Sequence, residues 1–333
     1  MFKLVKKQTI SPISLKEHFE RRNRVLIKRR VGGYGDILMQ RMIWEDFSKE
    51  LPELEFNYTC PAQYYDFANN HPFIKTIKIE EVEERNFGII YDITTPCRVH
   101  ESRYGASNKD NRSDIWARHC GIELKNHNMH MHLDEYILQI SHNGIKNINP
   151  ENLPTVLFTP QSTTCEFGQA KSLMPHQMKE VVEKLRNMGF FVFSIHNNNI
   201  EVFDEINVPQ ILNIHPSMWM ALTKISDYVI SVDTSTFHLA GGLGKKLVGI
   251  FTFTDGEVYG KYYDFILVQK HRSNGDWDCG PCFSNHTCPK SSDINKPCLT
   301  ELTSDDIIAG FTKLLNNENQ KIQPPIQIRH RLL

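Results

Sequence analysis

The sequence has no apolar run near the roughly 20 residues that a membrane-spanning helix needs. Its first residues also lack the apolar stretch and small-residue cleavage site of a secretory signal. The formal net charge is only -1 at pH 7, so no global affinity for polyanions is indicated. Internal repeats and low-complexity tracts are absent as well. These absences predict a cytoplasmic, globular, non-repetitive protein.

The composition is that of a folded protein with more than one core. The 333 residues are 40% hydrophobic and 23% charged, and a chain of this length usually forms two domains. Residues 147–154 hold two prolines and three asparagines, which is typical of a linker. We therefore predict an N-terminal domain of residues 1–148 and a C-terminal domain of residues 149–333.

Short apolar runs alternate with amphipathic segments in both halves, which predicts βαβ units and the α/β class. The predicted strands are residues 25–28, 56–60, 74–79, 88–93, 155–159, 190–194, 228–232 and 247–251. The predicted helices are residues 37–47, 62–70, 113–120, a helix from 175 to a C′ glycine at 189, residues 218–225, a helix after Asp233, and residues 304–315. Residues 97–135 show no regular pattern.

Two motifs stand where a predicted strand gives way to a predicted helix, which is where open α/β sheets place their ligands. The C-terminal motif runs from Ser231 to His238 (SVDTSTFH). Backbone N–H groups at such a turn suit a phosphate, Ser235 can add a hydroxyl donor, and His238 can supply a donor or a cation. The alternative is that Asp233 is a simple N-cap and His238 a core histidine.

The N-terminal motif runs from Gly32 to Asp36 (GGYGD). It lacks the spacing of the dinucleotide fingerprint and the Lys-Ser/Thr ending of a P-loop. Its glycines allow a substrate to approach the backbone, and the carboxylate can accept a proton. The alternative is an N-capping aspartate after a flexible turn.

Together these motifs resemble glycosyltransferase family 9, the ADP-heptose lipopolysaccharide heptosyltransferases. The resemblance rests on Val25–Asp36, on Lys171 with Pro175, and on Ser231–His238 with the later segment Phe253–Gly256. It covers roughly residues 24–315. It implies a GT-B fold, in which two Rossmann-like domains face each other across a cleft, and an inverting sugar transfer from a nucleotide-diphosphate donor without a catalytic metal.

The resemblance also implies roles for single residues. Asp36 matches the presumed general base, which takes the proton of the acceptor hydroxyl. Ser162 and Lys171 match residues that face the donor phosphates, and the donor pocket matches Asp233, Thr234, Ser235 and His238. His196 is either a contact to the base or ribose or a plain loop histidine. An ADP-sugar is the favoured donor, although the family's Asp-Thr-Gly is Asp233-Thr-Ser here and its Gly-Pro-Thr-Asp is Thr252-Phe-Thr-Asp.

Four of the eight cysteines are crowded as C-x2-C-x5-C-x9-C, at Cys279, Cys282, Cys288 and Cys298. Four thiolates at this spacing can hold zinc or iron in a closed, structural, tetrahedral site. Unligated thiols or disulfides are the alternative. The place of the cluster is similar to that of the iron-binding finger of the bacterial autotransporter heptosyltransferases, a branch with a ring-shaped assembly, which implies a homo-oligomer.

The predicted acceptor site lies in the N-terminal domain, at Gly33, Tyr34, Gly35, Arg103 and Arg112. Basic residues surround it: the first thirty residues carry ten Lys and Arg against two Glu. This charge suits a phosphorylated or polyanionic acceptor, namely lipopolysaccharide core, protein or DNA. A solvated charged face or an oligomer contact is the alternative. At the level of function, the alternatives are a DNA-modifying glycosyltransferase and a noncatalytic nucleotide- or nucleic-acid-binding protein of the same fold.

Overall fold

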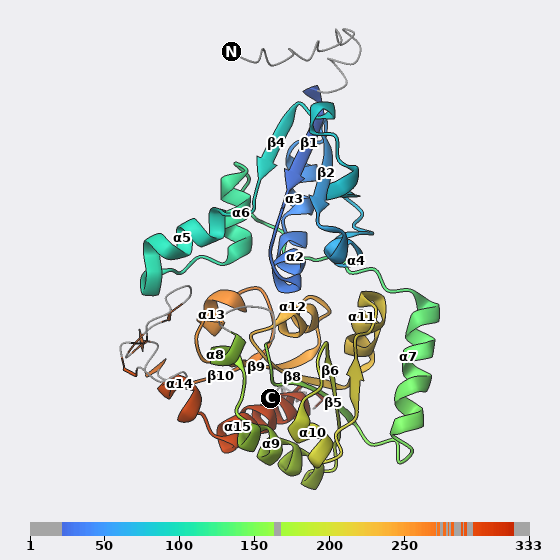
Figure 1. The fold of residues 1–333 in the computed structure, drawn as a ribbon, viewed down its shortest axis with the longest axis vertical. Coiled ribbons are helices and arrows are strands. Elements are labelled where there is room, and N and C mark those ends of the chain that lie inside the picture. The colour runs from blue at the N-terminus through green and yellow to red at the C-terminus, as the bar shows by residue number, and fades with distance from the viewer. Residues whose placement is uncertain are drawn as a thin grey trace, which may run out of the picture.

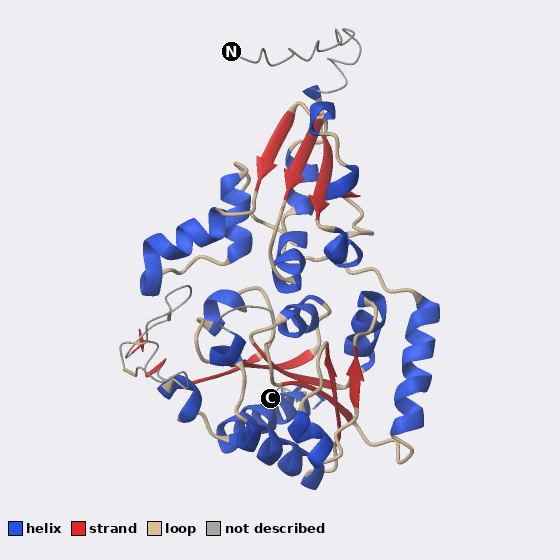
Figure 2. Ribbon diagram, in the orientation of Figure 1, coloured by secondary structure: helices blue, strands red, loops and turns tan. Residues whose placement is uncertain are grey.

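The computed structural model describes residues 22–162, 168–270, 272–273, 276–277, 279, 281–282, 288, 290–291 and 296–322. These residues form two lobes, each built on its own parallel sheet (Figure 1). The predicted α/β class is therefore confirmed. Figure 2 shows the strands of the two sheets lying in separate halves of the molecule, with helices around each.

The N-terminal lobe has a four-stranded parallel sheet in the order β3-β2-β1-β4. Its strands are β1 (Arg24–Lys28), β2 (Glu55–Cys60), β3 (Lys75–Lys78) and β4 (Ile89–Asp92). Its helices are α2 (Tyr34–Arg41), α3 (Trp44–Glu50), η1 (Ala62–Tyr64), α4 (Tyr65–Ala68), η2 (Ile79–Glu81), η3 (Glu84–Asn86), α5 (Pro96–Tyr104), η4 (Gly105–Ser107) and α6 (Arg112–His119).

The C-terminal lobe has a six-stranded parallel sheet in the order β10-β9-β8-β5-β6-β7. Its strands are β5 (Thr155–Thr159), β6 (Phe191–His196), β7 (Gln210–Leu212), β8 (Tyr228–Val232), β9 (Lys246–Phe251) and β10 (Ile266–Gln269). Its helices are α7 (Glu135–Ile148), α8 (Gly168–Lys171), α9 (Pro175–Asn187), α10 (Glu201–Glu205), α11 (Pro216–Ile225), α12 (Ser235–Gly242), α13 (Gly256–Tyr259), α14 (Pro297–Thr300) and α15 (Ser304–Ile322). The short pair β11 (Arg272–Ser273) and β12 (Asp276–Trp277) is antiparallel.

Each sheet has a switch point, where the chain changes the direction in which it adds strands. In the N-terminal lobe this point lies between β1 and β4, and in the C-terminal lobe between β5 and β8. Ligands of open α/β sheets bind beyond the carboxyl ends of the strands at such points. The segments after β1 and β8 are the two motifs that the sequence singled out.

Most predicted strands agree with the observed ones within two residues, and several helices differ. The predicted helix 37–47 is two helices, because Met42 N–H and Ile43 N–H bond to carbonyls three residues back and tighten the turn. Gly189 ends α9 with a φ of 87°, as expected of a C′ glycine. The long helices α5 and α7 were not predicted.

Helix α7 precedes the predicted domain boundary at residues 148/149 but packs on the C-terminal lobe. Its Ser141 hydroxyl lies 2.9 Å from the sulfur of Met218 in α11. Figure 1 shows α7 running alongside α11. The packing therefore groups α7 with the second sheet.

Candidate functional site

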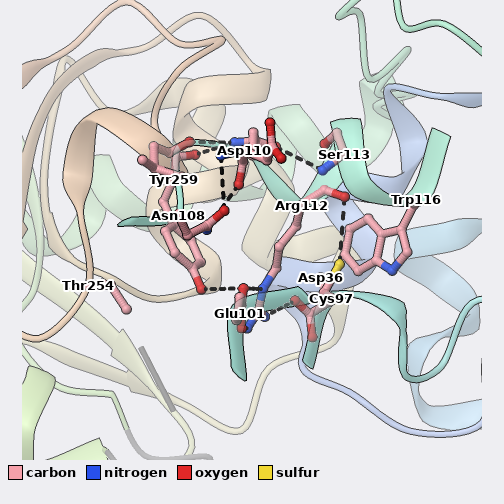
Figure 3. A network of polar contacts seen from close by, with 12 residues as sticks. Asp36, Cys97, Glu101, Asn108, Asp110, Arg112, Ser113, Trp116, Thr254 and Tyr259 are labelled. Atoms are coloured by element: carbon pink, nitrogen blue, oxygen red, sulfur yellow. Dashed lines mark hydrogen bonds and ion pairs between the residues drawn. The ribbon is translucent and has the colours of Figure 1, made fainter. Parts of the chain in front are cut away.

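Asp36 lies in the first turn of α2, directly beyond the carboxyl end of β1. Its carboxylate is held by two guanidinium groups. Arg29 Nη2 is 2.6 Å from Oδ2. Arg112 Nη1 is 2.6 Å from Oδ1, and Figure 3 shows this second contact. The N–H of Gly33, the N-cap, also donates to it over 3.4 Å. Burial would raise the pKa of Asp36, but Arg112 and Arg29 outweigh it and hold the pKa well below its usual range. Asp36 is therefore ionised at neutral pH.

Arg112 connects Asp36 to a second buried carboxylate. Its Nε and Nη2 donate to both oxygens of Glu101, over 2.6 and 2.8 Å, in a bidentate pair. Glu101 also accepts the hydroxyl of Tyr259 over 3.0 Å, and Tyr259 belongs to the C-terminal lobe. Although burial would lower the pKa of Arg112, Tyr259, Asp36 and Glu101 raise it well above the ordinary value. The charge of Arg112 is thus shared between two carboxylates.

The turn between β8 and α12 forms the opposite side of the site. Asp233 is 5% exposed, and its Oδ2 lies 2.7 Å from Lys171 Nζ and 2.5 Å from the Thr254 hydroxyl that donates to it. Burial would raise the pKa of Asp233, but Lys171 and His238 lower it. The Thr234 hydroxyl caps α12 by accepting the N–H of Thr236. The structure therefore brings Lys171 to the motif that holds Asp233 and His238, more than sixty residues later in the sequence.

His238 lies between the two halves of the site. A Cβ added to Gly35 at the start of α2 would lie 2.8 Å from His238 Cδ2, so the two helix starts touch across the lobes. Burial lowers the pKa of His238 to about 4, although Asp233 and Asp36 act to raise it. The imidazole is therefore neutral at pH 7, and of the two predicted roles it can serve as a hydrogen-bond donor rather than as a cation.

A pocket opens beside this turn, at the carboxyl ends of β5, β6 and β8, and encloses about 60 Å³. It is lined by Tyr34, Thr159, Gln161, Ser162, Ile195, His196, Asn197, Ile214, Trp219, Thr234, Ser235 and Thr236. Among the described residues, the buried hydroxyls of Thr159 and Thr236 and the indole N–H of Trp219 have no hydrogen-bond partner. Buried polar atoms without partners are costly, so water or a polar ligand completes these three groups at the pocket.

Four of the predicted donor residues line this pocket: Ser162, His196, Thr234 and Ser235. His196 is buried at the end of β6, and its Nε2 lies within hydrogen-bonding distance of the Ser194 hydroxyl. Burial lowers the pKa of His196 to about 4, so it too is neutral at pH 7.

Only some of the predicted acceptor residues lie close to Asp36. Gly33, Tyr34 and Gly35 adjoin Asp36, and the Tyr34 ring packs at 5.9 Å between centroids against Trp219 of the other lobe. Arg103 is exposed on α5 and does not join the Asp36 network in the described part of the chain. Much of the predicted basic N-terminal segment, residues 1–21, lies outside the described residues. Of its described cations, Arg24, Lys28, Arg29 and Arg30 form ion pairs.

The predicted cysteine finger is not confirmed. All four thiols are half-buried, and burial together with the other three thiols raises the pKa of Cys298 to about 12. The thiols thus lie close enough to influence one another. Among the residues that the structure describes, however, no three His, Cys, Asp or Glu side chains are arranged to hold a metal ion. No disulfide joins the described cysteines.

Sequence reasoning did not identify several residues of the site. Arg29, Glu101, Trp219, Thr254 and Tyr259 each contact a predicted residue or the pocket. Arg29 could have been found, since a cation at the end of β1 lies beside the glycine motif. Glu101 and Tyr259 carry no local signal, because their contacts depend on how α5, α6 and α13 pack.

No described helix is both long enough and apolar enough to cross a membrane.

Comparisons with known proteins agree with this geometry. The structure of E. coli ADP-heptose lipopolysaccharide heptosyltransferase II is 14% identical, with a TM-score of 0.63 over 89% of this chain and 99% of that one. A glycosyltransferase family 9 protein from Veillonella parvula is 11% identical, with a TM-score of 0.68 over 89% and 98%. The dodecameric, iron-containing heptosyltransferase TibC, solved with ADP-D-beta-D-heptose, is 17% identical, with a TM-score of 0.66 over 91% and 80%.

These similarities show the fold, and the expected two facing α/β domains match the GT-B-like architecture of heptosyltransferases. No curated protein sequence matches the chain. The model of glycosyltransferase family 9 (heptosyltransferase) matches residues 110–290, more than half of the sequence. The chain therefore belongs to glycosyltransferase family 9 and is a glycosyltransferase.

Proposed function

We propose that this enzyme transfers heptose or a related sugar, with inversion, from a nucleotide-diphosphate donor to an acceptor hydroxyl, with Asp36 as the general base. One observation carries the proposal: the start of α2, which bears Asp36, touches the start of α12, which bears the predicted donor residues. An inverting displacement needs a base on the acceptor side and positive polarity at the leaving diphosphate. The two lobes offer one of each.

On the donor side, Lys171, the start of α12 and the Thr236 hydroxyl would face the diphosphate. The unpartnered groups of Thr159, Thr236 and Trp219 support a ligand in this pocket. Heptosyltransferases of this fold have been solved with ADP-heptose and with ADP, and we propose an ADP-linked sugar here. A pocket of about 60 Å³ is far smaller than typical ligand sites. Donor binding therefore requires the lobes or the lining side chains to move apart.

On the acceptor side, Asp36 is ionised but paired with two arginines. The acceptor hydroxyl must approach the carboxylate past Arg29 and Arg112, and only 13% of the Asp36 side chain is exposed. A base of low pKa removes a proton efficiently only after the hydroxyl has become acidic. This fits a transition state in which the sugar–phosphate bond is largely broken before the acceptor oxygen loses its proton.

We also propose an anionic acceptor, namely a phosphorylated saccharide such as lipopolysaccharide core, and only then protein or DNA. The support is a set of exposed cations, namely Arg98 and Arg103 on α5 and Lys109 in the loop that follows η4. Arg112 adds less positive charge because two carboxylates balance it.

Four cysteine thiols are a donor set suited to zinc or iron, and the effect of the other three thiols on the pKa of Cys298 supports their proximity. We propose that Cys279, Cys282, Cys288 and Cys298 hold one such ion in a structural role. The similar TibC contains iron and is dodecameric, and a homo-oligomer is proposed here as well.

Replacement of Asp36 by Asn tests the proposed role. The variant keeps the shape of the side chain but loses the base, so turnover of ADP-heptose should fall about a hundredfold or more. ADP affinity, measured by calorimetry, should change less than about twofold, because the donor pocket is intact. Asp66→Asn, at a half-exposed ion pair with His215, is the matched control.

Two results would contradict the proposal. An Asp36→Asn variant with normal turnover would remove the aspartate as base. Wild-type protein that binds neither ADP nor UDP, GDP or CDP would remove the nucleotide-sugar donor itself.

A further inference from the structure

We propose that Glu101 and Tyr259 are positioning residues that fix Arg112 on Asp36 only when the two lobes are together. This inference rests on the proposed role of Asp36 and adds a dependence of the base on lobe closure. Neither residue belongs to the motifs that the sequence singled out.

Glu101 fixes the orientation of the Arg112 guanidinium. It is 3% exposed, and its two oxygens accept hydrogen bonds from Nε and Nη2 of Arg112 in a bidentate pair. This leaves Nη1 pointing at Asp36 Oδ1, at 2.6 Å. Because a guanidinium is planar, fixing one edge fixes the direction of the remaining N–H groups. Figure 3 shows Arg112 between the two carboxylates.

Tyr259 reaches this pair from the other lobe. Its hydroxyl donates to Glu101 over 3.0 Å, and its ring lies 5.3 Å from the Arg112 guanidinium carbon. Asn111 holds the two elements together, since its side-chain amide donates to the carbonyls of Val258 and Tyr259 over 2.8 and 3.1 Å. Separation of the lobes would remove the hydroxyl and the ring from Glu101 and Arg112 at the same time.

The balance of charges around Asp36 explains why loss of the Tyr259 contacts would affect the base. Asp36 and Glu101 are balanced by Arg29 and Arg112. If Arg112 is free to turn toward Glu101 alone, Asp36 keeps only Arg29, and its pKa rises toward that of an ordinary carboxyl group. Closure therefore sets both the position and the proton affinity of the base.

The other groups that face Asp36 are identified by their electrostatic effect. They are Arg29 after β1, Tyr58 of β2, Cys97 of α5 and His238 of α12. Burial raises the pKa of Tyr58 and Cys97 well above the ordinary values, so neither titrates near neutral pH. His238, with a pKa of about 4, belongs to the donor side, and the pH dependence of ADP affinity reports on it separately.

The same interface supplies a matched control. Tyr262 also donates its hydroxyl across the lobes to a carboxylate of α6, Asp114, which lies outside the Asp36 network. Tyr259→Phe and Tyr262→Phe thus each remove one hydroxyl–carboxylate bond between the lobes. Only the Tyr259 bond is connected to Asp36, through Glu101 and Arg112.

The experiment measures ADP release from ADP-heptose, ADP affinity and the pH dependence of kcat for the two variants and for Glu101→Gln. Tyr259→Phe should lower kcat about tenfold, the size expected for a hydrogen bond to a charged group. ADP affinity should stay within about twofold, and the acid limb of kcat should move up in pH. Glu101→Gln should also lower kcat, because it loosens the hold on Arg112, and Tyr262→Phe should leave the acid limb unchanged.

Equal losses in Tyr259→Phe and Tyr262→Phe, or an acid limb that does not move, would overturn the inference and leave both tyrosines as structural contacts. Wild-type protein without ADP release would instead overturn the proposed function, and the inference with it. If Glu101→Gln fails to fold, the two tyrosine variants still decide the question.

Discussion

Several buried charges in this enzyme have partners from distant parts of the chain. Asp36 forms an ion pair with Arg112. Asp233 forms an ion pair with Lys171 and accepts a hydrogen bond from Thr254. A buried charge without partners would cost several kcal/mol, so each of these contacts restrains where the lobes and loops lie. The residues that hold the site therefore also stabilise the fold around it.

The cysteine cluster provides a prediction for one residue. If four thiolates hold a structural metal, Cys282→Ser should release it and lower the melting temperature, because metal binding contributes to folding. Metal analysis of the purified protein and a thermal melt measure both effects. Cys120→Ser, at a buried thiol of the N-terminal lobe, should leave the metal content unchanged. Equal metal content in Cys282→Ser and wild type would end the metal hypothesis.

Whether the sequence predicts a site residue depends on how far along the chain its contact partners lie. Asp36, Asp233 and His238 follow from local strand–loop–helix patterns, and the structure brings them close together. Glu101 and Tyr259 are 158 residues apart, and no local pattern reports such a pair. The four cysteines show the opposite case, since their spacing predicts a metal site that the described residues do not confirm.

At the scale of elements, the approach of α2 to α12 depends on one glycine. A methyl group at Gly35 would lie 2.8 Å from His238 Cδ2, whereas one at Gly33 would meet nothing within 4 Å. Gly35→Ala should therefore hold the helix starts apart and lower turnover about tenfold or more. Gly33→Ala should have little effect, and both variants should melt within a few degrees of wild type. Equal activity of the two variants would show that the close approach is not needed.

The strands that the sequence predicts match the structure more closely than the predicted helices do. β5 is buried at all five positions, and its predicted and observed bounds coincide. Helix α7 has a cap that could have been recognised, since the Asp134 side chain accepts the N–H groups of Tyr136 and Ile137. Helix α5 has a polar sequence (PCRVHESRY) and little amphipathic pattern. Tertiary contacts, such as those of Glu101, stabilise it instead.

For the whole molecule, three buried histidines predict a loss of stability in mild acid. Burial lowers the pKa of His71 to about 2 and those of His196 and His238 to about 4. Below about pH 6.5 the unfolded chain binds protons at these residues and the folded chain does not, so the free energy of unfolding falls as pH falls. The loss should be on the order of 3 kcal/mol by pH 4 for each of His196 and His238.

Urea unfolding between pH 7 and pH 4 measures this loss. His238→Gln should make the curve shallower, whereas His215→Gln, at a side chain that is 64% exposed, should not. Below pH 4, protonation of Asp36 and Asp233 should destabilise the fold further, because their folded pKa values are lowered. A stability that stays constant from pH 7 to pH 4.5 would contradict the buried, neutral state of these histidines.

The segment that joins the two lobes is short. Arg41, at the end of α2, donates to the carbonyls of Met129 and His130 over 2.7 and 2.6 Å, and α7 begins at Glu135 on the other lobe. In the described part of the chain, residues 131–134 link these two points. So short a tether lets the lobes swing about one point but not drift apart. An acceptor on one lobe and a donor on the other would therefore stay at an effective concentration in the millimolar range or above, even in the open state.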